Sequence, residues 1–257
     1  MGWNPEQYEK FKAERFAPFE DLLALIDKQP DLSFVDLGCG TGELTARLQQ
    51  ALSGSLGQGY DSSANMLKQA EVWQNEQLHF EQKAIEAVNG LSPRQWDLVF
   101  SHAALQWVDD HRALFAQIWQ QVKPGGQLAV QMPSNHSHLT HRLLTEMAAE
   151  EPFYSALQGW HRHSPVLGLE AYAQLLFELG AEAQVVIEKV YPHVLNDATG
   201  MVEWVKGTAL VPYLERLGSE LAAQWLEMYT QRLADAYPQK PVFYGFRRLL
   251  IWARKPL

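Results

Sequence analysis

Apolar positions along the first half of the chain follow two alternating patterns. Short apolar runs, bounded by polar or glycine-rich stretches, predict buried strands at residues 33–38, 55–61, 78–82, 96–103 and 127–133. Apolar residues at helical spacing predict intervening helices at residues 15–27, 42–52, 63–74 and 111–122, the last stopped by Pro124-Gly125-Gly126. Alternation of this kind is typical of βαβ units, so it predicts a parallel sheet with right-handed crossovers.

The pattern changes after Pro133. Helical spacing predicts an interrupted helix at 139–160 and further helices at 168–180, 198–217 and 219–237, with long strands at 183–195 and 242–255. We therefore expect an α/β fold: a Rossmann-like, seven-stranded, mostly parallel sheet in an αβα sandwich, with helical additions after strands five and six.

The whole chain, residues 1–257, is expected to form one domain. Its cofactor-binding core spans about residues 30–133, and the helical additions span about residues 134–165 and 197–240. Open α/β folds bind ligands at the carboxyl edge of the sheet, and the additions are placed to cover that edge.

Composition narrows the classes of function. The 257 residues carry a net charge of −9, which argues against nucleic-acid or anionic-membrane partners, because both require clustered cations. A single cysteine, Cys39, excludes an intrachain disulfide framework and suits a reducing cytosol. The chain shows no 18-residue apolar run and no leader pattern, so we expect a cytoplasmic protein. The sequence does not predict an oligomeric state.

A glycine-rich loop follows the first predicted strand in "FVDLGCGTGELT". Gly38, Gly40 and Gly42 leave the main chain open to close approach by a ligand, and Asp36 stands just before them. Asp61 lies 19 residues after Gly42, at the end of the second predicted strand, where a carboxylate can accept both hydroxyls of a ribose. The alternative is a tight turn followed by Asp61 as a helix N-cap.

The spacing of this loop indicates which nucleoside it binds. It reads G-x-G-x-G rather than the dinucleotide pattern G-x-G-x-x-G, and the chain has no P-loop pattern. An acid such as Asp36 beside the loop suits a cationic amino group better than a pyrophosphate. These features favour S-adenosylmethionine, which carries ribose and adenine but no phosphate.

The motifs resemble those of the class I S-adenosylmethionine-dependent methyltransferases. "VDLGCGTG", "GYDSSANML", "WDLVFSHAALQWVDD" and "VKPGGQLAVQMP" carry the resemblance over residues 34–133. The resemblance implies that Asp61 holds the ribose and that Met66 packs by the adenine. It also implies that the main-chain N–H of Ile85 meets the adenine, whereas Ala84 replaces an acid that relatives carry. The implied cofactor-binding set is Asp36, Gly38, Cys39, Gly40, Gly42, Asp61, Ser62, Met66, Ala84, Ile85 and Ser101.

Further segments, several of them outside these motifs, resemble the trans-aconitate 2-methyltransferases. They are "WNPEQYEKFKAERFAP", "LQWVDDH", "LAVQMPSN", "EWVKGTALVPYL" and "FRRLLIWARK". The resemblance implies methylation of a free carboxylate on a small polycarboxylic acid. Two alternatives stay open: a carboxyl methyltransferase for malonyl-acyl-carrier protein, and a non-catalytic cofactor-binding protein. The net charge of −9 disfavours the acidic carrier protein as a partner.

Carboxylate methylation shapes the expected substrate site. A carboxyl group with a pKa near ~4 is already ionised at neutral pH, so positioning groups are expected rather than a general base. Arginine pairs with carboxylates through two parallel hydrogen bonds, and the candidates are Arg15, Arg247 and Arg248. The last two are neighbours on a strand and point to opposite faces, so at most one should reach the site.

Other candidates follow the fourth predicted strand. We expect His102 near the transferred methyl group, Trp107 as a pocket wall and Gln106 near the ribose or the substrate; His102, Arg15 and Trp107 form the expected catalytic set. Each can instead be structural: a loop histidine, a core tryptophan or a surface arginine. Asp110 and His111 are expected to cap the following helix.

A cluster of histidines and a cluster of aromatic residues are both interpreted as structural. His136, His138 and His141 have no carboxylate nearby to complete a ligand set, so no metal site is expected. Trp204, Tyr213 and Trp225 recur at helical spacing and are expected to pack the helical additions together.

Overall fold

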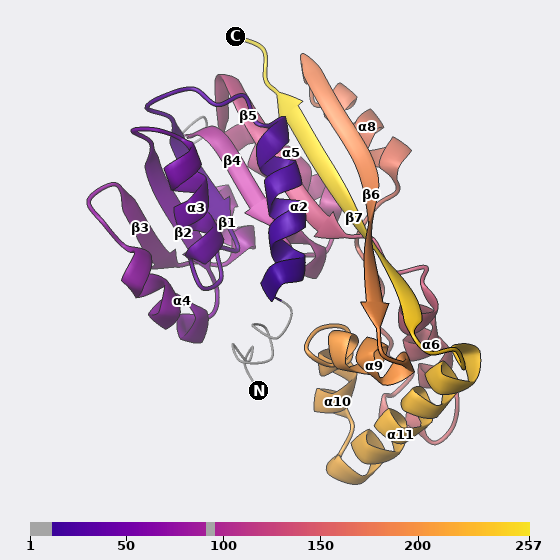
Figure 1. Ribbon diagram of the computed structural model, residues 1–257. Helices are drawn as coiled ribbons and strands as arrows, with labels where there is room; N and C mark the ends of the chain where they lie inside the picture. The colour runs from indigo at the N-terminus through magenta and orange to yellow at the C-terminus, as the bar shows by residue number, and fades with distance from the viewer. Residues whose placement is uncertain (1–11, 91–95) are drawn as a thin grey trace.

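The computed structural model describes residues 12–90 and 96–257, and its centre is a seven-stranded sheet in the order β3-β2-β1-β4-β5-β7-β6 (Figure 1). Strands β1 to β5 are parallel, whereas β7 runs antiparallel to β5 and to β6. This confirms the Rossmann-like, mostly parallel sheet. The strands are β1 (Ser33–Leu37), β2 (Leu56–Asp61), β3 (Leu78–Gln82), β4 (Trp96–His102), β5 (Val122–Pro133), β6 (Ala183–Leu195) and β7 (Val242–Arg254).

Helices cover both faces of the sheet. On one face, α2 and α3 pack against residues such as Phe34, Phe100 and Leu250. On the other face, α5 and α8 pack against Val99 and Ile251. The helices are α2 (Lys12–Leu25), α3 (Glu43–Ala51), α4 (Ala64–Ala70), α5 (His111–Gln121), α6 (Leu139–Ala148), α7 (Phe153–Ala156), α8 (Leu169–Glu178), α9 (Ala198–Lys206), α10 (Val211–Arg216) and α11 (Ser219–Ala236), with short 3-10 turns η1 (Glu71–Trp73), η2 (Ile85–Gly90) and η3 (Leu105–Trp107).

Two of the differences from the sequence-based expectation are the largest. Helix α5 ends at Gln121, and β5 begins at Val122 and runs through Gly125, so the strand is longer than predicted. Gly125 keeps strand-like pairing by donating to the carbonyls of Lys255 and Pro256 at 3.1 and 3.0 Å. The predicted helix at 198–217 is two helices, α9 and α10, separated by a turn.

The helical additions have a hydrophobic core of their own. Strands β6 and β7 run past the ends of the other strands, and α6, α9, α10 and α11 gather at their far end (Figure 1). Tyr213 and Trp225 stack there with ring centroids 5.1 Å apart, and Trp225 is fully buried. The expected packing role of these two aromatic residues is therefore confirmed. Truncating such a buried aromatic side chain costs about 3–5 kcal/mol, so this core holds the additions together firmly.

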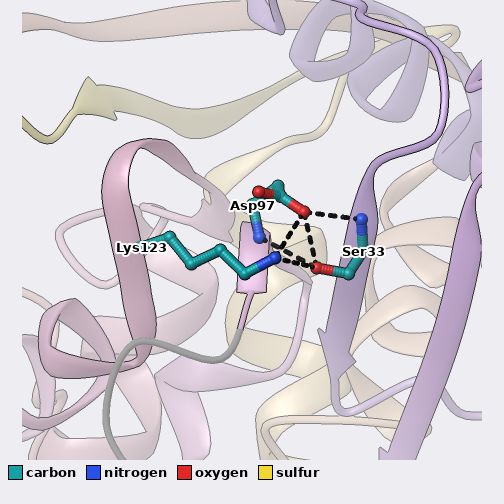
Figure 2. Close-up of polar contacts among 3 residues, drawn as sticks. All are labelled: Ser33, Asp97 and Lys123. Carbon is teal, nitrogen blue, oxygen red and sulfur yellow. Dashed lines mark hydrogen bonds and ion pairs between the residues drawn. The ribbon is translucent and has the colours of Figure 1, made fainter. Parts of the chain in front are cut away.

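A polar cluster ties three strands together at the start of β1 (Figure 2). Asp97 Oδ2 accepts hydrogen bonds from Lys123 Nζ at 2.9 Å, from Ser33 Oγ at 2.6 Å and from Ser33 N–H at 2.8 Å. Burial opposes ionisation of Asp97, but the hydrogen bonds from Lys123 and Ser33 outweigh it and hold the pKa of Asp97 below its usual value.

Within residues 12–90 and 96–257, no helix is both long enough and apolar enough to cross a membrane.

Candidate functional site

The glycine loop connects β1 to α3 through three residues with left-handed backbone. Gly38, Gly40 and Gly42 have φ values of 84°, 56° and 75°. A Cβ at Gly38 would lie 2.1 Å from Ala104 Cβ, and one at Gly42 would lie 2.8 Å from Ala70 Cβ. A Cβ at Gly40 would meet no heavy atom of the described chain within 4 Å. Gly38 and Gly42 thus allow close packing, whereas Gly40 leaves its backbone open to a ligand.

Asp61 ends β2 beside this loop. Its Oδ2 accepts the N–H of Gly40 at 2.9 Å, and its Oδ1 accepts the N–H of Ser63 at 2.8 Å. Ser63, not Asp61, caps α4 by accepting the N–H of Met66 at 3.3 Å. Each carboxylate oxygen keeps further lone-pair capacity, so the fixed carboxylate can accept two more hydrogen bonds from a ligand diol.

Asp36 lies beneath the glycine loop and is 3% exposed. Its Oδ2 accepts a hydrogen bond from Thr45 Oγ1 at 2.6 Å, whereas its Oδ1 is buried with no hydrogen-bond partner among the described residues. Burial raises the pKa of Asp36 to about 7, against the lowering effect of Thr45 and with a smaller raising effect from the charge of Asp61. A ligand that brings a cationic amino group here would give Oδ1 of Asp36 a hydrogen-bond partner and would favour the ionised carboxylate.

Four further residues of the expected cofactor set differ in their burial. Met66 is buried on α4, and Ser62 is exposed just before that helix. The Ile85 side chain reaches within 3.6 Å of a Cβ built on Gly38, so it borders the loop directly. Ala84 is exposed beside it and carries no polar side chain for an adenine amino group.

The remaining two members of that set are buried within the fold. Cys39 is 8% exposed, and burial raises the pKa of its thiol, so it stays protonated at neutral pH. Ser101 is fully buried and donates a hydrogen bond to the carbonyl of Leu37 at 2.7 Å. Its hydroxyl therefore links β4 to β1, directly under the glycine loop.

A cavity of about 460 Å³ lies between the ends of β4 and β5 and the helical additions. Among the described residues, no aspartate or glutamate lines it, although the chain carries 30 acidic residues. Its basic and imidazole lining residues are Arg162, Arg248, His136, His141, His161 and His163. Such a lining favours an anionic ligand.

The two cavity arginines each lie over an aromatic ring. The Cζ of Arg162 is 3.9 Å from the ring centroid of Trp107, and the Cζ of Arg248 is 4.4 Å from that of Phe246. Arg247, by contrast, forms an ion pair with Glu188 at 3.6 Å and does not line the cavity. The strand alternation predicted this division between the two neighbouring arginines.

His141 contributes a neutral imidazole to the same cavity. Burial, reinforced by the charges of His138, His136 and Arg162, lowers the pKa of His141 to about 3, so its imidazole is neutral at neutral pH. His138 instead caps α6, where its Nδ1 accepts the N–H of Thr140 at 3.2 Å. Within the described chain, no three histidine, cysteine or acidic side chains are grouped to hold a metal ion.

The turn after β4 lies between the glycine loop and the cavity. Ala104 in this turn packs against Gly38, while Gln106 and Trp107 line the cavity. His111 holds the turn, since its Nε2 hydrogen-bonds to the carbonyl of Leu105 at 3.0 Å. His111 is thus a buried anchor rather than a cap.

The expectation that Asp110 caps the following helix is confirmed. Asp110 is the N-cap of α5, because its carboxylate accepts the N–H of Ala113 at 3.1 Å.

Of the three expected catalytic residues, only Trp107 is found among the described residues that line the cavity. Trp107 lines the cavity, whereas His102 is 6% exposed at the end of β4, with its ring edge-on to Phe19 at 6.1 Å, and is not a lining residue. Arg15 belongs to α2, but its side chain lies outside the part of the chain that the structure describes. Roles for His102 and Arg15 stay predictions.

Sequence reasoning missed the irregular segment that follows α7. Arg162, His161 and His163 line the cavity from this segment. The signal available was "WHRHS", which gathers three cationic or imidazole side chains without any helical or strand periodicity.

Comparisons with known proteins match either a part of the first half of the chain or nearly all of it. A family model described as "Methyltransferase domain" matches residues 35–130. The chain is 48% identical to a trans-aconitate 2-methyltransferase of Deinococcus radiodurans, over 100% of this chain and 99% of that protein. It is 36% identical to a trans-aconitate 2-methyltransferase of Variovorax paradoxus, over 99% of each.

Solved structures share the fold at low sequence identity. The YcgJ protein from Bacillus subtilis matches with a TM-score of 0.63 and 13% identity, over 94% of this chain and 99% of that chain. Phosphoethanolamine N-methyltransferase 2 of Haemonchus contortus, solved in complex with S-adenosyl-L-methionine, matches with a TM-score of 0.54 and 18% identity, over 95% of this chain and 53% of that chain.

Proposed function

The chain belongs to the class I S-adenosylmethionine-dependent methyltransferases, and we propose that it methylates a carboxylate of a small polycarboxylic acid such as trans-aconitate. One observation carries the choice of substrate. Arg162 and Arg248 line a single cavity that, within the described chain, no acidic side chain lines. The curated relatives with full-length similarity, named for trans-aconitate, support the same substrate.

The glycine loop fits the cofactor of this family. In the proposed arrangement Asp61 accepts the ribose hydroxyls, and Asp36 faces the cationic amino group through its open Oδ1. Gly40 admits the cofactor against its backbone. When bound, S-adenosylmethionine supplies a sulfonium methyl group, so that a carbon–oxygen bond forms at a carboxylate as the carbon–sulfur bond breaks and sulfur keeps the electron pair. The wider proposed set is the one predicted from the motifs, including Cys39, Gly42, Ser62, Met66, Ala84, Ile85 and Ser101.

The protein's own residues need only hold the acid. A carboxylate is ionised at neutral pH and attacks through oxygen without losing a proton, so no general base is required. Arg162 and Arg248 can each pair with one carboxylate, because a guanidinium placed over an aromatic ring presents its N–H groups at its edge. Two anchored carboxylates orient a third toward the turn after β4. Positioning of this kind can supply up to about 7–11 kcal/mol of the barrier reduction.

We propose a division of labour within one methyltransferase domain over residues 1–257. The core at about 30–133 holds the cofactor, and the additions at about 134–165 and 197–240 enclose the acid. Leu144 on α6, Val205 on α9 and Tyr213 on α10 line the cavity from these additions. Helices that close over the acid exclude water, which strengthens the pairing of carboxylates with arginines.

Mass measurement of reaction products tests this function. Purified protein is incubated with S-adenosylmethionine and, separately, with trans-aconitate, cis-aconitate, citrate or malonyl-acyl-carrier protein. We expect trans-aconitate to gain one methyl group. Methylation of the carrier protein alone would support the first alternative, and cofactor binding without methylation of any acceptor would support a non-catalytic protein.

A further inference from the structure

The cavity is larger than a small tricarboxylic acid requires. Trans-aconitate has about twelve non-hydrogen atoms, which fill less than the roughly 360 Å³ that twelve liquid waters occupy. The cavity measures about 460 Å³. None of the glycine-loop residues is among its described lining residues.

Part of the cavity lining is an apolar wall on the side of the helical additions. Leu144, Trp204, Val205 and Phe246 line the cavity, and none is more than 8% exposed. The rings of Trp204 and Phe246 pack with centroids 5.1 Å apart. Carboxylates placed against this wall would lose hydration without gaining hydrogen bonds, so a simple polyacid makes no use of it.

Charged anchors and the apolar wall therefore belong to one cavity. Arg162 lies by Gln106, whose carbonyl accepts from its Nη2 at 3.0 Å, on the side of the β4 turn. Arg248 borders the wall through Phe246. A ligand that matches both parts has two or more carboxylates and one apolar substituent.

We propose that the cavity takes polycarboxylic acids bearing a branched alkyl or aromatic substituent, which packs against Leu144, Trp204, Val205 and Phe246 while Arg162 and Arg248 hold the carboxylates. This inference rests on the proposed function and extends its substrate class. Methylation of such an acid follows the same transfer to a carboxylate oxygen. Trans-aconitate then uses only the charged part of the cavity.

The experiment compares succinate with 2-isobutylsuccinate and 2-benzylsuccinate, measured beside trans-aconitate. Each methylene that packs on the wall is expected to improve kcat/KM about fourfold, so the two substituted acids should exceed succinate at least about tenfold. Substituted acids no better than succinate, with trans-aconitate methylated, would overturn the inference and leave the proposed function standing.

A pair of variants tests whether the preference for substituted acids arises in the cavity. Ala209 is half-buried and lines it, so Ala209→Leu fills the apolar side. Ala222→Leu adds the same volume to the same helical cluster, at a position that does not line the cavity. We expect Ala209→Leu to lower the ratio of kcat/KM for benzylsuccinate over trans-aconitate at least about tenfold, and Ala222→Leu to leave it unchanged. Equal loss on both acids in Ala209→Leu would refute the proposed subsite.

Calorimetry separates this inference from the proposed reaction. 2-Benzylsuccinate is titrated into the wild-type protein and into Ala209→Leu, each saturated with S-adenosylhomocysteine. Binding to the wild type that is at least about tenfold weaker in the variant supports the subsite even if no acid is methylated. Absence of binding to the wild type contradicts it, whatever happens with trans-aconitate.

Discussion

The guanidinium of Arg162 lies over the indole of Trp107, with its Cζ 3.9 Å from the ring centroid. The same guanidinium donates to the carbonyl of Gln106 at 3.0 Å. It therefore ties the irregular segment after α7 to the turn after β4, whose Ala104 packs against the glycine loop. In the proposed arrangement, the acid-binding cavity and the cofactor loop therefore share this one turn.

Replacing Arg162 should weaken binding of the acid much more than binding of the cofactor. Loss of a buried charged partner costs about 2–5 kcal/mol, so Arg162→Met should raise the KM for trans-aconitate about thirtyfold or more. Arg216 offers a matched control, because its Cζ lies 3.8 Å over the ring of Trp160 but it does not line the cavity. Steady-state kinetics should show little change in Arg216→Met. Equal rises in the two KM values of Arg162→Met would exclude a specific role in holding the acid.

A methyl group at Gly40 should block the cofactor. Gly40 and Gly180 both have positive φ, 56° and 79°, and both would carry a Cβ with no described heavy atom within 4 Å. Alanine at either position should cost about 1 kcal/mol of stability through backbone strain. Only Gly40→Ala should raise the Kd for S-adenosylmethionine, by at least about tenfold. Calorimetric titration of both variants checks this, and an unchanged Kd in Gly40→Ala would show that the cofactor does not approach there.

Ionisation of Asp36 should make the cofactor-free protein less stable as pH rises. Its pKa is about 7 in the fold against a reference value of 3.8, so the protonated carboxyl contributes stability that is full below about pH 4 and is lost as pH rises through 7. Urea unfolding across this range should show the free energy of unfolding falling in the wild type, and Asp36→Asn should remove that fall. Thr45→Val removes the hydrogen bond that lowers the pKa, so it should shift the fall to higher pH.

The same group should make cofactor binding dependent on pH. Because a cationic amino group favours the ionised carboxylate, affinity for S-adenosylmethionine should weaken by up to about tenfold per unit as pH drops below 7. In Asp36→Asn the affinity should be weaker and flat over that range. A pH dependence that survives this substitution would assign the titration to another group.

An acid introduced at position 84 should strengthen cofactor binding. The motif resemblance implies an acid where Ala84 stands, and Ala84 is exposed beside Ile85 at the rim of the glycine loop. A new charge-assisted hydrogen bond to the adenine amino group is expected to lower the Kd for the cofactor about tenfold in Ala84→Asp. Ala87→Asp adds the same charge three residues later, also at an exposed position, and should leave the Kd unchanged in calorimetry.

The cluster around Asp97 should contribute modestly to stability. Asp97→Asn should lower the free energy of unfolding by about 1–2 kcal/mol at neutral pH, because Ser33 and Lys123 lose a charged acceptor. The pKa of Asp97 is lowered in the fold, so this stability is present above about pH 4 and is lost as pH falls through the folded pKa. Urea unfolding of Asp97→Asn and the wild type should converge in acid. Lys68→Met, on the exposed face of α4, serves as a surface control and should change little.

Local pattern was sufficient to predict the sheet and the glycine loop. The predicted strands at 78–82 and 183–195 coincide with β3 and β6, because alternation of apolar residues with turns is itself a local signal. Gly38, Gly40 and Gly42 were recognisable because left-handed backbone favours glycine, so a cluster of glycines is a local signal of it. Boundaries were less certain: β5 begins five residues before its predicted start at Gln127, where pairing with the chain end overrides the local Pro-Gly-Gly signal.

Only the tertiary structure revealed the cavity. Arg162 comes from an irregular segment, Arg248 from β7 and His141 from α6, and no spacing along the chain relates them. Burial also determines their charge states, as in the neutral His141, because desolvation depends on what packs around a group. Periodicity along the chain therefore identified the scaffold and the glycine loop, whereas convergence of distant segments selected the side chains that line the cavity.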